Sequence, residues 1–161
     1  MSDGNVPAWC PPALGEIASA RGDASWRQHG VELTRRLQAL LTEGIHEIAE
    51  IDSGLLIRVA IGDRSQVVAL YVRDVGERVV ETISLAGDAP SGPRLVAALA
   101  ANATPSAAGL VVLGIAGTEY LCARAANPLA TLDDPELVRL VFAASELADG
   151  WEERYAEEDL L

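Results

Sequence analysis

The sequence contains few of the residues that usually carry metal-binding or redox chemistry. Its two cysteines, Cys10 and Cys122, and its two histidines, His29 and His46, stand far apart in the chain. A structural metal site needs several such ligands at matched spacing, so this pattern predicts no metal site. Two cysteines without motif spacing also indicate reduced thiols, and we therefore expect a cytoplasmic protein rather than a disulfide-stabilised one.

Catalytic and nucleotide-binding motifs are also missing from the sequence. None of the serines has the context of a nucleophile elbow. The glycine-containing run from Gly109 to Gly114 is not followed by the Lys-Ser/Thr pair of a phosphate-binding loop. No acid–base pair, activated nucleophile or metal cluster emerges from the pattern. We expect a protein that is not an enzyme and that uses no cofactor.

Basic residues are too few for a protein that binds polyanions. Twelve Lys and Arg face 24 Asp and Glu, which gives a net charge of −12. This charge repels phosphates, so we expect neither nucleic acid nor an anionic membrane as a partner. The N-terminal residues lack the basic start and apolar run of a signal peptide, and no apolar run reaches transmembrane length. The length of 161 residues suits one domain with a proper core.

Residues 55–85 read as an antiparallel meander of β-strands. Apolar residues alternate in runs 55–61, 65–73 and 78–85, and short turns containing Gly62 and Gly76 separate these runs. Residues 45–52 predict a further strand before the meander. Residues 110–115 and 119–126 predict a second hairpin, with its turn at Gly117.

Three helices accompany the predicted strands. A helix over residues 24–43 buries Leu33, Leu37 and Leu40, a short one covers 93–102, and a long one covers 135–155 with Leu140, Leu147 and Trp151 inward. Asp133 or Asp134 caps the long helix. The predicted fold class is α+β: helix, strand meander, helix, two-strand hairpin and long C-terminal helix. We expect a loose N-terminal lead-in over 1–22, with at most a short helix at 12–20, and one domain over 23–161.

The strand at residues 67–72 is apolar on both faces. One face can be covered by the protein's own helices, whereas the other needs a second cover. We therefore expect a homodimer, with Val68, Leu70 and Val72 as its possible dimer face.

The final third of the chain carries a family resemblance. A helix ends in Leu99-Ala100-Ala101-Asn102, and the segment Asn127-Pro128-Leu129-Ala130-Thr131-Leu132-Asp133 leads into a helix that ends Ala148-Asp149-Gly150-Trp151. With the order of elements and the acidity, this pattern resembles the bacterial type III secretion chaperone-like superfamily, which includes YbjN-type domains. The resemblance covers residues 26–155, although the meander has one strand more than the minimal family member. It implies a small acidic homodimer that binds a segment of a partner protein without ATP, or a YbjN-type regulator.

Four residues of the long helix are candidates for binding that partner. Val138 and Phe142 lie outside the main apolar stripe, which indicates a contact that the core of one subunit does not need. Glu152 and Glu153 follow and would favour a basic flank on the partner. The expected function is therefore protein or peptide binding, and Phe142→Asp should abolish binding but leave the fold intact. The alternative is a sensory domain that binds a small molecule, which an enclosed polar pocket would favour.

Overall fold

The computed structural model describes residues 6–40, 44–104 and 106–158 of the chain. Helices and strands follow one another as α1 (Pro12–Arg21), α2 (Trp26–Ala39), β1 (Ile45–Ile51), β2 (Gly54–Ile61), β3 (Arg64–Asp74), β4 (Arg78–Asp88), α3 (Pro93–Ala100), β5 (Gly109–Ile115), β6 (Thr118–Pro128) and α4 (Asp134–Glu158). The α+β fold class and the order of the predicted elements are confirmed. The predicted helix over 24–43 ends earlier, at Ala39, and its residues 41–43 lie outside the described part of the chain.

All six strands form one antiparallel sheet in the order β1-β2-β3-β4-β6-β5. The first four strands are a meander, as the alternation of apolar residues predicts. The second hairpin then joins through β6, which pairs with β4 along residues Val79 to Asp88. Its turn places Ala116 and Gly117 at φ values of 50° and 83°. Such positive angles twist a tight turn in the sense that adjoining strands require.

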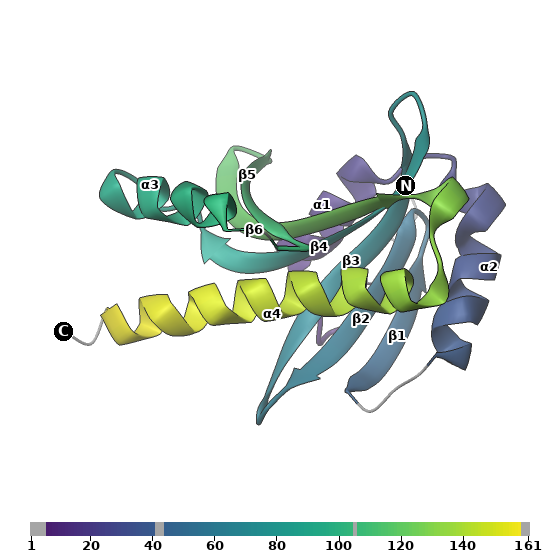
Figure 1. Ribbon diagram of the computed structural model, residues 1–161, viewed down its shortest axis with the longest axis horizontal. Helices are drawn as coiled ribbons and strands as arrows, with labels where there is room; N and C mark the ends of the chain where they lie inside the picture. Colours follow the sequence, from purple (N-terminus) through teal and green to yellow (C-terminus); the bar gives the residue numbers. More distant parts are fainter. Residues whose placement is uncertain (1–5, 41–43, 105, 159–161) are drawn as a thin grey trace.

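One face of the sheet carries the main core, beneath α2 and α4. In Figure 1, α4 crosses this face and α2 lies at the end of the sheet near β1. The buried core residues are Trp26, Leu33, Leu37, Leu55, Ile57, Val59, Val68, Leu70, Val72, Val80, Ala125, Leu137, Leu140, Val141 and Ala144. Leu40 and Leu147 pack at the margin of this core and stay half-buried. The faces of α2 and α4 predicted from their apolar stripes are therefore those that the protein buries.

Gly30 lies within the apolar stripe of α2 for a local reason. A Cβ atom at this position would come within 2.5 Å of the Trp26 ring, so the indole lies directly over the glycine. The small residue makes room for the tryptophan one turn earlier on the same helix.

A reciprocal cap fixes the start of α4. The backbone N–H of Glu136 donates to Asp133 Oδ1 at 2.8 Å, and the backbone N–H of Asp133 donates to Glu136 Oε2 at 3.1 Å. These bonds form a capping box and identify Asp133, rather than Asp134, as the cap residue. Neither α4 nor any other helix in the described ranges combines the length and apolarity needed to cross a membrane.

The opposite face of the sheet is covered by α1. Leu14, Ile17 and Ala18 of this helix are fully buried against Leu56, Ala69, Tyr71 and Ile83 of the sheet. In Figure 1, α1 lies behind the sheet, on the side away from α4. The expected loose lead-in over 1–22 thus differs from the structure at residues 12–21, which form a packed helix. Residues 1–5 lie outside the described part.

The proposed dimer face is part of the subunit's own core. Val68, Leu70 and Val72 are 0% exposed and pack beneath α2 and α4. The expectation that they form a dimer face is therefore wrong, because both faces of β3 are covered within one chain. The second cover that β3 requires is α1, whose Leu14 and Ile17 pack on the opposite face of the sheet.

Candidate functional site

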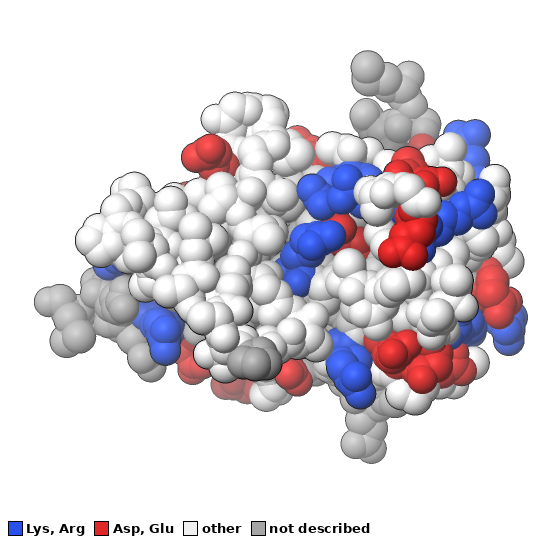
Figure 2. Space-filling view, turned by 45° about the horizontal axis from the view of Figure 1, so that its top comes forward, with Lys and Arg blue, Asp and Glu red and all other residues white. Residues whose placement is uncertain are grey.

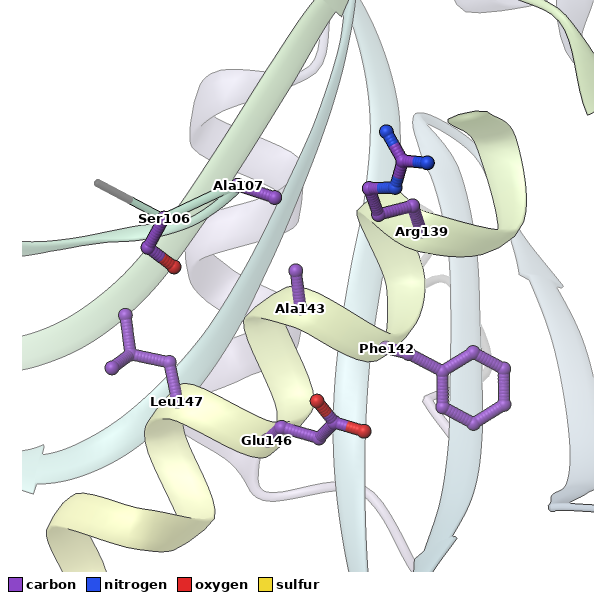
Figure 3. Close-up of a pocket in the computed structure, with 7 residues that line it drawn as sticks. All are labelled: Ser106, Ala107, Arg139, Phe142, Ala143, Glu146 and Leu147. Carbon is purple, nitrogen blue, oxygen red and sulfur yellow. The ribbon is translucent and has the colours of Figure 1, made fainter. Parts of the chain in front are cut away.

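A groove runs along the outer side of α4, between this helix and the segment that precedes β5. Its lining residues are Ser106, Ala107, Arg139, Phe142, Ala143, Glu146 and Leu147, and its volume is about 460 Å³. In Figure 3, Ala143 and Leu147 point toward Ser106 and Ala107, whereas Phe142 points to the other side of the helix. We call this feature the α4 groove.

The floor and rim of the α4 groove differ in chemistry. Ala143 and Leu147 are half-buried, and together with Ala107 they give the groove an apolar floor. Arg139 and Glu146 are exposed and lie two helical turns apart, so that one charge of each sign borders the groove. The groove can therefore accept an apolar side chain and meet polar groups on either side of it.

Phe142 belongs both to the α4 groove and to the core. Its side chain is half-buried and packs against the main core, and a Cβ atom at Gly44 would lie 3.4 Å from its ring. The interpretation of Phe142 as a residue that the core does not need is thus wrong, because its side chain packs against the core and Gly44 lies beside its ring. Val138, one turn earlier, is half-buried and is not part of the groove lining.

The two candidate glutamates lie on α4 beyond the groove. Glu152 and Glu153 are exposed. Arg64 Nη2 lies 2.6 Å from Asp149 Oδ2 and 3.3 Å from Glu153 Oε2, so a single arginine offsets part of the acidity here. The groove residues that sequence reasoning missed are Ser106, Ala107, Arg139, Ala143, Glu146 and Leu147. They come from two elements, and no spacing in the sequence joins them.

A second hollow lies between α2 and the edge strand β1. It is lined by Trp26, Arg27, Gly30, Val31, Glu50, Ile51 and Asp52 and has a volume of about 460 Å³. Val31 is 79% exposed and gives this hollow an apolar contact. Beside it, β1 pairs with β2 on one side only. The hollow therefore combines an apolar contact with the free edge of a sheet.

The other end of the sheet carries a surface with little charge. Between Asp88 and Glu119, Arg94 is the only charged residue in the sequence. Val96 and Leu99 of α3 are 68% and 45% exposed, and β5 is the terminal strand of the sheet. Figure 2 shows few charges over the part of the molecule formed by α3 and β5, at the left of the view. We call this feature the α3–β5 surface.

The two cysteines and His29 could in principle act as nucleophiles or metal ligands, but their surroundings do not favour either role. Burial raises the pKa of the Cys10 thiol to about 11 and that of Cys122 to about 12, so both are protonated at neutral pH and are poor nucleophiles. His29 Nε2 lies 2.8 Å from Arg78 Nη1. Within the described residues, no group of three or more His, Cys, Asp or Glu is arranged to hold a metal ion.

Comparison with known proteins shows that the fold is similar to that of a solved structure. No family model and no curated protein matches the sequence. A chain in the solved structure of the HopA1–SchA chaperone–effector complex is similar, with a TM-score of 0.53 and 21% sequence identity over 81% of this chain and 98% of that chain. At this identity the likeness concerns the fold alone. The chain has a secretion-chaperone-like α+β fold, and this solved neighbour belongs to a complex of a chaperone with its effector.

Proposed function

We propose that this protein is a non-enzymatic, chaperone-like domain that binds a segment of a partner protein in the α4 groove. The observation that carries the proposal is the groove itself, a hollow with an apolar floor and a polar rim on the outer side of the longest helix, on a fold similar to that of a chain in a chaperone–effector complex. The named role of that neighbour makes protein binding the expected use of such a surface. Transport of the partner, or its regulation as in YbjN-type proteins, would use the same contact.

The shape of the groove favours a peptide over a small molecule. The hollows at α4, at the α2–β1 edge and beside His29 are all open to solvent. A small ligand is usually held in a concave site that encloses most of its surface, whereas a helical or extended peptide lies along an open groove. The alternative function, a sensory domain that binds a small molecule, gains no support from these three hollows.

The residues around the groove predict features of the bound segment. An apolar side chain of the segment would lie on Ala143 and Leu147. Arg139 and Glu146 would contact polar or charged groups on each side of that anchor. The exposed Glu152, with Glu153 held in part by Arg64, would favour a basic residue farther along. We expect an amphipathic segment with a basic end.

A substitution at an exposed groove residue tests the proposal without touching the core. Ala107 is exposed and lines the groove, so Ala107→Arg fills the hollow and places a charge in it. The matched control is Ala39→Arg at an exposed position near the end of α2. We expect the wild type and the control to capture the same partner from native lysate, and Ala107→Arg to lose it. Equal capture by all three proteins would contradict the proposal.

We further propose that the protein forms a homodimer through the α3–β5 surface. The outer edge of β5 has unpaired backbone groups, and natural proteins usually cover or charge such an edge. Here the neighbouring helix adds the exposed Val96 and Leu99, and Arg94 is its one charged residue. Two copies related by a twofold axis would bury both features, since the same patch would meet itself.

Light scattering of two variants would test the dimer. Val96→Glu combined with Leu99→Glu places four like charges in a symmetric interface, and we expect this protein to be a monomer at concentrations where the wild type is a dimer. Val31→Glu, which changes an even more exposed valine on α2, is the control and should stay dimeric. A wild-type monomer at high micromolar concentration would rule the dimer out.

The cytoplasmic location expected from the sequence stays a prediction.

A further inference from the structure

Three arginines converge on one buried carboxylate on the face of the sheet that α1 covers. Glu81 on β4 is 0% exposed. Arg21 at the end of α1 reaches its Oε1 through Nε at 2.8 Å and Nη2 at 2.7 Å, and Arg124 on β6 reaches its Oε2 through Nε at 2.8 Å and Nη2 at 2.6 Å. Arg73 on β3 approaches the same Oε2 at 3.4 Å. We call Arg21, Arg73 and Arg124 the arginine cluster.

The carboxylate at the centre of the cluster is ionised. Burial alone would raise the pKa of Glu81, but hydrogen bonds from its arginine and tyrosine partners outweigh burial and hold the pKa below its ordinary value. The tyrosine is Tyr71, whose hydroxyl donates to Oε1. Burial, and next to it the charge of Glu81, raises the pKa of Tyr71, which therefore stays a donor.

Positive charge is in surplus at this point of an otherwise acidic protein. One carboxylate balances one guanidinium, and here three guanidiniums share Glu81. A second carboxylate, Asp23, lies near Arg73. A hydrogen bond from the backbone N–H of Asp74 lowers the pKa of Asp23 most, and the charge of Arg73 lowers it further. In the interactions of the described residues, the three cations of the cluster thus face two anions, Glu81 and Asp23.

The arginine cluster can be reached from solvent. The side chains of Arg21, Arg73 and Arg124 are 21%, 29% and 37% exposed, whereas Glu81 beneath them is fully buried. A guanidinium carries five N–H donors in a planar fork. Among the described residues, Arg73 contacts Glu81 through one nitrogen at the outer limit of hydrogen bonding, which leaves most of its donors for another acceptor.

We propose that the arginine cluster is a binding site for an oxyanion group, a carboxylate or a phosphate. Arginine is the side chain whose fork matches the oxygens of both groups in a bidentate manner. The chain contains no lysine, and three of its twelve basic residues meet at this one place. Glu81 holds the three guanidiniums side by side, and the incoming anion adds the missing negative charge from the solvent side. The site lies on the sheet face opposite α4, so it is independent of the α4 groove.

Anion titration of the full chain tests this site. Inorganic phosphate and succinate serve as probes in calorimetry at constant ionic strength, and the tighter of the two identifies the group that the site prefers. We expect saturable binding that weakens about tenfold in Arg73→Gln, since one charged hydrogen-bond donor is lost. Arg35→Gln is the control, because Arg35 pairs with Glu32 on the exposed side of α2. Equal affinities in all three proteins, or no saturable binding, would overturn the proposal.

Replacement of the central carboxylate gives an opposite and more specific effect. Glu81→Gln removes the negative charge that competes for the three guanidiniums, so phosphate or succinate should bind more tightly than to the wild type. The variant should have a lower melting temperature, and added anion should raise that temperature by more than it does in the wild type. A purely structural cluster would lose stability without rescue by anion. If Glu81→Gln does not fold, Arg73→Gln decides the question alone, since Arg73 makes the weakest contact with Glu81.

Discussion

Thr82 on β4 donates a hydrogen bond from its hydroxyl to the backbone carbonyl oxygen of Leu140 on α4, at 2.7 Å in the buried core. This bond joins the centre of the sheet to the middle of the helix that forms the α4 groove. Thr82→Val keeps the side-chain shape but removes the donor. We expect a loss of about 1 kcal/mol in the free energy of unfolding by urea. The exposed Thr118→Val should change it by less than about 0.5 kcal/mol.

Leu140 itself is the most direct test of how α4 packs. It is 3% exposed within the main core. Leu140→Ala should lower the free energy of unfolding by about 2–5 kcal/mol, because it removes buried methyl groups and leaves a cavity. Val75→Ala is the control, since Val75 is 58% exposed in the turn after β3. A cost for Leu140→Ala below about 1 kcal/mol would show that this face of α4 is not packed as described.

The lowered pKa of Glu81 predicts how the free energy of unfolding depends on pH. Its folded-state pKa is lower than the ordinary value of 4.5, so the ionised carboxylate stabilises the folded protein above that pH. This contribution is lost as the pH falls below 4.5 through the folded-state pKa. We expect urea unfolding to show a steep loss of stability with acid, and a shallower slope in Glu81→Gln. Some slope should remain there, because hydrogen bonds also lower the pKa of Asp23. Identical slopes would contradict the assigned role of Glu81.

Periodicity in the sequence predicted the sheet and the main helices because both depend on repeating local patterns. The alternation in residues 55–85 and the stripe from Leu137 to Trp151 are buried as expected. Such patterns cannot state which helix covers which face of a sheet. The apolar residues Val67 and Tyr71 indicated that the second face of β3 is also covered. Nothing in the local sequence showed whether a partner subunit or the chain's own α1 covers it. The tertiary packing of α1 decided that question.

The arginine cluster could not be predicted from the sequence, since its three arginines and Glu81 come from four different elements. Arg21, Arg73, Glu81 and Arg124 share no spacing, and only the pairing of β3, β4 and β6 brings three of them together. One weak signal existed. Glu81 lies between Val79 and Ile83 in an alternating strand, so a charged residue occupies an inward position. A buried charge of this kind requires a partner, and it therefore indicates a polar network within the fold.

The last prediction separates binding from stability at Phe142. Its ring packs against the core and against Gly44, so Phe142→Asp should lower the free energy of unfolding by about 1–3 kcal/mol as well as abolish partner binding. Ala107→Arg, at an exposed position across the groove, should abolish binding with a change in stability below about 0.5 kcal/mol. Urea unfolding and capture of the partner, measured on both variants, test the two effects separately. If Ala107→Arg binds normally and only Phe142→Asp fails, the loss comes from a weakened fold, and the α4 groove is not the binding site.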